Sequence, residues 1–326
     1  MFSKKTAVAA AALLAAFAAQ AQSQVSIYGN LDVSVGRFEE PGTDSVTAVG
    51  SGSLRQSFIG FKGQEDLGAG LNAFFVLESA IAVDTGANVG NFWGRTSVVG
   101  LSGDFGTVAI GNARTLLFQA NDAFNPFRAD SGLFTTSGLV MSTAVGAVNS
   151  GYSTNWSNSI TYTSANLGGF TGAVQWAASE NTNDDNYGLA LNYAAGPLAV
   201  NLTYQDVNLT SSVDVATWVL GGSYDFGVVK LFGQYGQADQ SNLSEKEKFF
   251  QLGASIPVTA AGNILASYGE GKYDSSKARE VSVAYEHSLS KRTGAYVGVN
   301  NTRHNFVVAP ANKSGTSFAV GVRHSF

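Results

Sequence analysis

Apolar and polar side chains alternate along residues 24–37. The apolar positions are Val25, Ile27, Leu31, Val33 and Val35, and the positions between them are Ser26, Tyr28, Asn30, Asp32 and Ser34. A period of two predicts a β-strand, because successive side chains of a strand point to opposite faces. One such strand fits a soluble sandwich as well as a membrane barrel, so the number of alternating segments decides between them.

Fifteen further segments of similar length show the same alternation between turn signals. These further segments, which together with 24–37 make sixteen, are 53–65, 69–82, 92–103, 105–114, 156–166, 168–179, 185–195, 197–208, 213–225, 227–238, 246–256, 260–271, 278–289, 291–303 and 315–326. Repeated alternating segments of about ten residues, even in number, are the signature of a bacterial barrel. We therefore predict an all-β fold, a 16-stranded antiparallel transmembrane β-barrel.

The connections between these segments predict the direction of the strands. Short turns, such as 166–169 and 194–197, alternate with longer polar loops, such as 38–52 and 237–245. Bacterial barrels carry short turns on the periplasmic rim and long loops outside. The first strand should therefore rise from the periplasmic side.

One connection, from Thr115 to Asn155, is much longer than the others. A connection of this length in a compact fold usually has a function, and the lumen of a 16-stranded barrel is wide enough to hold water. An external position would leave Leu133 and several aromatic side chains in water; these are Phe118, Phe124, Phe127 and Phe134. We expect this third external loop to fold into the lumen, the alternative being an exposed surface loop.

The amino-terminal residues 1–21 have the pattern of a secretory signal peptide. Lys4 and Lys5 precede an Ala-rich apolar run that closes with Ala19-Gln20-Ala21. The run is shorter than the roughly 20 residues that span a bilayer as a helix, so a membrane anchor is the weaker interpretation. We expect a signal peptide at 1–21 and a single barrel domain at 22–326.

Composition excludes several classes of function. The chain has no cysteine, which removes disulfides, thiolate metal sites and thiol nucleophiles. His287, His304 and His324 lack the spacing of a zinc site or of a hydrolytic triad. A net charge of −5 with scattered basic residues argues against nucleic acid as a partner. We expect no cofactor, no metal and no catalysis.

Several motifs, in order along the chain, resemble the general porins of β-proteobacteria, the family that includes neisserial and Burkholderia-type porins. They are 24–29 (QVSIYG), 60–70 (GFKGQEDLGAG), 77–79 (LES), 94–95 (GR), 99–111 (VGLSGDFGTVAIG), 158–162 (NSITY), 289–293 (LSKRT) and 321–326 (GVRHSF). The resemblance runs from about residue 24 to the end of the chain. It implies a homotrimer in the Gram-negative outer membrane, through which small hydrophilic solutes and ions diffuse passively.

The resemblance also implies a charged constriction, with basic residues on the barrel wall facing acidic residues on the inward loop. Arg95 keeps the family's basic position on the fourth strand, whereas Phe58 and Asn155 stand where arginines are usual. The candidate constriction residues are Arg37, Lys62, Arg95, Arg114 and Arg128, with Asp122 and Asp130 as the acidic candidates. Arg55 is a further candidate, but alternation does not assign it to one face. The family's anion preference is carried over as an expectation.

The terminal Phe326 shares one face with Phe318, Val320, Val322 and His324. An aromatic residue at this place suits the periplasmic aromatic girdle, and we expect it to serve as the C-terminal signal for the barrel-assembly machinery. The expected surroundings are outer-membrane lipid and lipopolysaccharide. A substrate-specific channel and an outer-membrane barrel enzyme are the two alternatives to a general diffusion porin.

Overall fold

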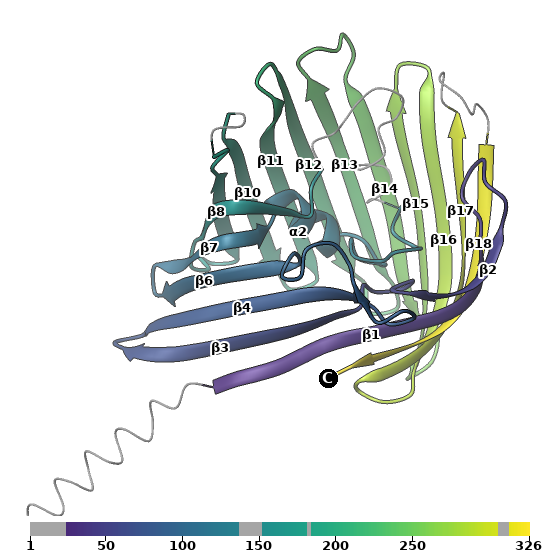
Figure 1. Ribbon diagram of the computed structural model, residues 1–326, viewed down its shortest axis with the longest axis horizontal. Helices are drawn as coiled ribbons and strands as arrows, with labels where there is room; N and C mark the ends of the chain where they lie inside the picture. Colours follow the sequence, from purple (N-terminus) through teal and green to yellow (C-terminus); the bar gives the residue numbers. More distant parts are fainter. Residues whose placement is uncertain (1–23, 137–151, 181–183, 306–312) are drawn as a thin grey trace, which may run out of the picture.

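The computed structural model describes residues 24–136, 152–180, 184–305 and 313–326. The predicted signal peptide at 1–21 lies outside the described residues, as does part of the long loop. None of the described residues forms a helix long and apolar enough to cross a membrane. The strands form one closed antiparallel sheet (Figure 1).

The hydrogen-bonded segments in chain order are β1 (Gln24–Phe38), β2 (Val46–Ser51), β3 (Phe58–Gly68), β4 (Leu71–Ala82), β5 (Ala87–Asn88), β6 (Thr96–Gly103), β7 (Gly106–Arg114), β8 (Asn155–Thr163), β9 (Phe170–Ala177), β10 (Asn186–Ala195), β11 (Leu198–Thr210), β12 (Val213–Asp225), β13 (Lys230–Gln240), β14 (Glu247–Pro257), β15 (Gly262–Tyr273), β16 (Ser276–Ser288), β17 (Thr293–Asn305) and β18 (Lys313–Ser325). The helix α2 (Leu116–Ala123) follows β7. β2 and β3 share one place in the ring, since β2 pairs with the upper half of β1 and β3 with its lower half. β5 consists of two residues that pair with the end of β4 and does not take a place of its own in the ring. The barrel therefore has sixteen strands, as the alternation predicts.

Burial in this barrel is inverted relative to a soluble protein. Along β1, Asp32 and Ser34 are buried, whereas Val25, Ile27 and Val35 are exposed. The polar face lines the inside of the ring and the apolar face is left for hydrocarbon, as a membrane barrel requires.

Aromatic side chains mark both edges of the outward apolar band. Pairs such as Tyr224–Phe226 and Phe170–Tyr193 lie at the short turns, each with ring centroids 4.5 Å apart. Phe250–Tyr268 lies toward the opposite ends of β14 and β15. Such belts sit at the two membrane interfaces, where an amphipathic ring contacts both lipid and water.

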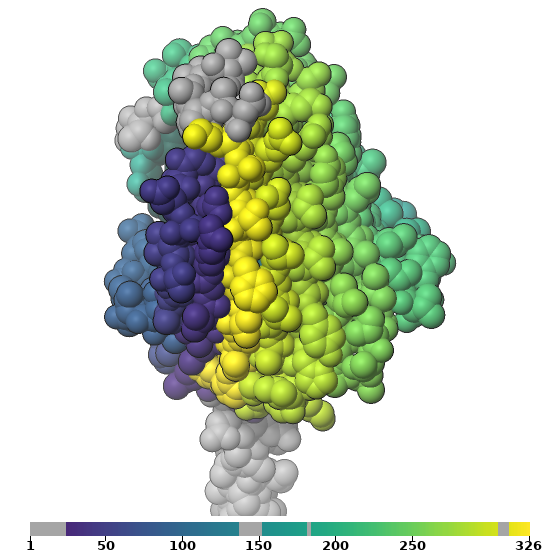
Figure 2. All heavy atoms as spheres, turned by 90° about the vertical axis from the view of Figure 1, so that its right-hand side faces the viewer, coloured from purple at the N-terminus to yellow at the C-terminus, as the bar shows by residue number. Residues whose placement is uncertain are grey.

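The barrel closes where the two ends of the chain meet, and Figure 2 shows β18 running beside β1. The last residue continues this pairing, because Phe326 N–H donates to Gly29 O at 3.2 Å and Gly29 N–H donates to Phe326 O at 3.1 Å. A Cβ at Gly29 would lie 2.7 Å from the Phe326 ring and 2.5 Å from Phe58 O. Glycine at position 29 thus makes room for the terminal aromatic ring.

We predict that Gly29→Val impairs closure of the barrel. The branched side chain would displace the Phe326 ring and the adjacent strand, and overpacking of this kind costs about 1–3 kcal/mol. The urea midpoint of the heat-modifiable folded band on a gel measures the loss. Gly172→Val is the matched control, since a Cβ at this strand glycine would meet nothing within 4 Å. Equal midpoints for the two variants would contradict the closure role.

Candidate pore constriction

The described part of the long connection lies inside the ring. Thr115 is the N-cap of α2, and its Oγ1 accepts a hydrogen bond from Phe118 N–H at 3.0 Å. Gln234 Nε2 on β13 donates to Phe124 O at 3.1 Å, and the hydroxyls of Thr136 and Ser267 on β15 are 2.8 Å apart. Gln234 and Ser267 face inward, so residues 115–136 contact the inner wall (Figure 1). Residues 137–151 of the predicted inward loop lie outside the described residues.

Aromatic side chains attach this segment to the inner wall. Phe127 and Phe134 are 0% exposed, and their rings are 5.5 Å apart. Phe134 also meets the Tyr296 ring of β17 edge-on, at 6.4 Å. Buried aromatic pairs contribute packing energy beyond the area that they bury. The segment is therefore held as a packed core would be, which explains the apolar residues that a water-exposed loop would not contain.

The barrel wall itself bends toward this segment between β2 and β3. The buried carboxylate of Asp32 accepts hydrogen bonds from the N–H groups of Leu54 and Arg55 at 2.9 and 2.7 Å, and from Tyr296 Oη at 2.6 Å. Leu54 then packs in the same cluster as Phe127. The predicted strand 53–65 accordingly begins at Phe58, because residues 52–57 bond to Asp32 and to the loop instead of continuing the ladder.

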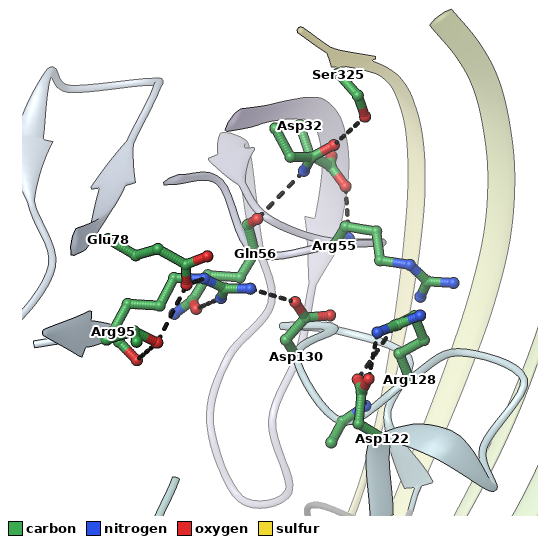
Figure 3. Close-up of polar contacts among 12 residues, drawn as sticks. Asp32, Arg55, Gln56, Glu78, Arg95, Asp122, Arg128, Asp130 and Ser325 are labelled. Carbon is green, nitrogen blue, oxygen red and sulfur yellow. Dashed lines mark hydrogen bonds and ion pairs between the residues drawn. The ribbon is translucent and has the colours of Figure 1, made fainter. Parts of the chain in front are cut away.

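Arg95 connects the wall to the inserted segment. Its Nε donates to Glu78 Oε2 at 3.0 Å, its Nη2 donates to Asp130 Oδ2 at 3.1 Å, and its Nη1 contacts Gln56 Oε1 (Figure 3). The Arg95 side chain is 10% exposed and stacks over the Phe58 ring at 4.2 Å. The expected basic position is thus on the inner wall, but its charge is fully paired with carboxylates from β4 and the loop.

Arg55 of the wall and Arg128 of the loop turn lie near one another (Figure 3). Arg55 Nη1 donates to the backbone oxygens of Leu54 and Phe127. Arg128 has a left-handed backbone with φ of 61°, and its guanidinium pairs with Asp122. The Arg128 side chain remains 56% exposed. Left-handed non-glycine residues often mark functional turns, and this turn places Arg128 beside the two expected acidic residues, Asp122 and Asp130.

The structure places the remaining candidates at different sites. Arg114 lies at the end of β7 with its guanidinium 4.4 Å over the Phe118 ring. Lys62 is on the inner face of β3, as alternation predicts, with Nζ 4.8 Å over the Tyr28 ring. Arg37 shares the outward face of β1 with Val35, is 63% exposed and pairs with Glu39 at 3.6 Å. Arg37 is therefore not brought together with the other candidates, because its odd position on β1 turns it away from the lumen.

A hollow of about 400 Å³ lies between the wall and the loop. The charged side chains that line it are Arg95, Arg114, Arg128, Glu78, Asp122 and Asp130. Each of the three carboxylates contacts an arginine: Glu78 and Asp130 contact Arg95, and Asp122 contacts Arg128. Arg114 makes no ion pair within the described part of the chain. Three arginines and three carboxylates thus line the hollow, and their formal charges balance.

Several residues at this site are missing from the candidates proposed from the sequence. Glu78 and Gln56 hold Arg95, and Arg323 pairs with Glu286 on the inner wall below it. Glu78 carried a usable signal, because a carboxylate within the apolar strand 71–82 must face water. Gln56 carried none, since its role depends on the bend of the wall.

Comparison with known proteins agrees with this architecture. The sequence profile of the Gram-negative porin family matches residues 7–305. The chain is 32% identical to outer membrane porin protein 32 of Delftia acidovorans, over 99% of this chain and 100% of that protein. It is 30% identical to an outer membrane porin protein of Bordetella pertussis, with the same coverage of 99% and 100%.

A solved structure shares the fold at similar sequence identity. The anion-selective porin from Comamonas acidovorans superimposes with a TM-score of 0.83 and 29% identity, over 94% of this chain and 100% of that chain. The chain belongs to the Gram-negative porin family, and it is a passive channel of the outer membrane rather than an enzyme.

Proposed function

We propose that this porin is a general diffusion channel that prefers anions, with its narrowest part between the barrel wall and residues 115–136. One observation carries the proposal. The three arginines and three carboxylates that line the hollow balance, and Lys62 and Arg55, which make no ion pair among the residues that the structure describes, add two positive charges near it. A fixed positive charge between low-dielectric walls raises the local concentration of anions.

Neighbouring residues add to the positive field. Lys62 faces the lumen on β3, and Arg55 lies at the loop turn with backbone oxygens as its hydrogen-bond partners. The Comamonas relative is named anion-selective. The small-solute filter is thus made of side chains that the loop and the wall contribute jointly.

We also propose a homotrimer as the working form, on the strength of the family resemblance. Phe326 is proposed as the group that the barrel-assembly machinery recognises, because its ring stays partly exposed at the seam of the barrel. Residues 1–21 are proposed to be the signal peptide that directs export.

We predict that Arg114→Glu lowers the anion preference. The substitution replaces an unpaired cation beside the hollow with an anion. Even at the dielectric constant of water a unit charge at 4 Å contributes about 1 kcal/mol, which corresponds to a roughly fivefold change in the ratio of anion to cation permeability. Reversal potentials in a KCl gradient measure this ratio. Arg37→Glu is the matched control, since Arg37 faces outward, and an equal shift in both variants would contradict the assignment.

We predict that Arg95→Gln destabilises the barrel more than Arg128→Gln does. Loss of the Arg95 guanidinium leaves Glu78 and Asp130 without a cation in a largely buried place, which costs about 3 kcal/mol. The Arg128–Asp122 pair is more exposed, and its loss costs about 1 kcal/mol or less. Thermal conversion of the folded band measures stability, and current noise in planar bilayers measures movement of the loop. Equal stability and equal noise in the two variants would show that Arg95 does not hold the loop.

The trimer gives a separate prediction for planar bilayers. Each insertion of the folded porin should raise the conductance by an amount that later closes in three equal steps, because each subunit carries its own pore. A single closing step per insertion, together with a monomeric band on a native gel, would exclude the trimer and leave the pore assignment intact.

A further inference from the structure

Five basic side chains lie on the outer face of the barrel, away from the pore. They are Lys248 on β14, Lys272 on β15, Lys277 and Arg279 on β16, and Arg303 on β17. Their parity along the strands is that of Leu252, Val281 and Val299, which are exposed apolar residues of the lipid-facing band. We call these five residues the cationic arc. Figure 2 views part of this side of the barrel from outside.

Register brings like charges of the arc directly opposite one another. Lys272 pairs across the sheet with both Lys248 and Lys277, and Arg279 pairs with Arg303. Like charges at directly opposed positions destabilise a sheet. The sequence thus places three unfavourable pairs side by side, and an anion bound between them would offset these repulsions.

Among the residues that the structure describes, one carboxylate pairs with the arc. Glu270 on β15 accepts from Arg279 Nε at 2.8 Å and from Lys277 Nζ at 3.2 Å. Within the described ranges, Lys248, Lys272 and Arg303 make no ion pair. The arc with Glu270 therefore carries an excess of four positive charges at neutral pH.

The arc lies at the level of the outer membrane interface. Its residues occupy the ends of β14 to β17 that are opposite to the Phe326 end of the barrel. Immediately below it, toward the middle of the membrane, the Phe250 and Tyr268 rings meet at 5.8 Å. Long basic side chains above an aromatic belt reach the level of lipid head groups.

Positive charge is not a general property of this rim. On β11, β12 and β13 the outward side chains at the same ends of the strands include Asp206, Asp214 and Asp239. The outer circumference is therefore divided into an acidic sector and a basic sector. A general preference for charged side chains at this rim would not by itself separate acidic residues from basic residues.

We propose that the cationic arc binds the phosphate groups of a phosphorylated glycolipid of the outer leaflet. Arginine forms two parallel hydrogen bonds to a phosphate, lysine supplies a point charge, and the apolar side chains below contact the acyl chains. The lipid would relieve the three opposed like-charge pairs. Because the arc is outside the pore, the proposal stands or falls independently of the anion preference.

The test uses the folded porin in neutral detergent and bis-phosphorylated lipid A as the probe. A combined Lys248→Gln, Lys272→Gln, Arg279→Gln and Arg303→Gln variant should bind lipid A at least about tenfold more weakly, as judged by native mass spectrometry. Lys277 is kept so that Glu270 retains a partner. The matched control, Lys291→Gln with Arg292→Gln in the turn after β16, should change affinity less than about twofold.

Further measurements distinguish a bound lipid from soluble phosphate and from a neighbouring subunit. Single-channel conductance of the combined variant should equal that of the parent, because none of its changes faces the lumen. Unchanged lipid A affinity would overturn the proposal. Displacement of lipid A by millimolar inorganic phosphate would overturn it in favour of a soluble phosphate site. Loss of oligomers on a native gel, with lipid A binding per subunit retained, would overturn it in favour of a subunit interface.

Discussion

A strand within hydrocarbon must have all its backbone groups paired, and the rest of this structure depends on that requirement. No water is present there to bond an exposed edge, so the sheet has to close upon itself. Closure is completed at one seam, where Phe326 and Gly29 exchange backbone hydrogen bonds. The absence of a side chain at Gly29 and the bulk of the terminal ring are two parts of the same fit.

The same requirement explains how the wall can bend into the lumen. Residues 52–57 leave the ladder beside β1, and their N–H groups would be orphaned if nothing replaced the lost partners. Asp32 bonds three of these groups, those of Leu54 and Arg55 through its carboxylate and that of Gly52 through its backbone oxygen, and Asp130 O accepts from Gln56 N–H at 2.9 Å. The bend and the inserted loop therefore stabilise each other. Neither can be altered without exposing buried polar groups in the other.

Period-two alternation was sufficient to predict the strands, their number and the face of most side chains. It placed Asp32 and Lys62 inside correctly. The family resemblance put Arg37 among the pore candidates, whereas its odd position on β1 turns it outward with Val35. Alternation could not place Arg55, because the segment around it is not a strand. Alternation could not predict the partners of Arg95 either. Glu78, Gln56 and Asp130 are distant from it in sequence, and they meet it only when the ring has closed and the loop has packed.

The partners of an arginine, rather than its presence, decide what it does in this barrel. Arg95 occupies the position that the family uses for a pore charge, yet two carboxylates surround it and its field is largely cancelled. Arg114 carries the same charge nearby without an acidic partner in the described ranges, so it contributes more of the field felt by a passing ion. On the outer wall, Arg279 is paired with Glu270 while Arg303 opposite it is not, within the part of the chain that the structure describes. We therefore propose that a porin of mildly acidic composition presents positive charge both to solutes in its lumen and to phosphates in its membrane, because the carboxylates nearest these basic residues are engaged in ion pairs.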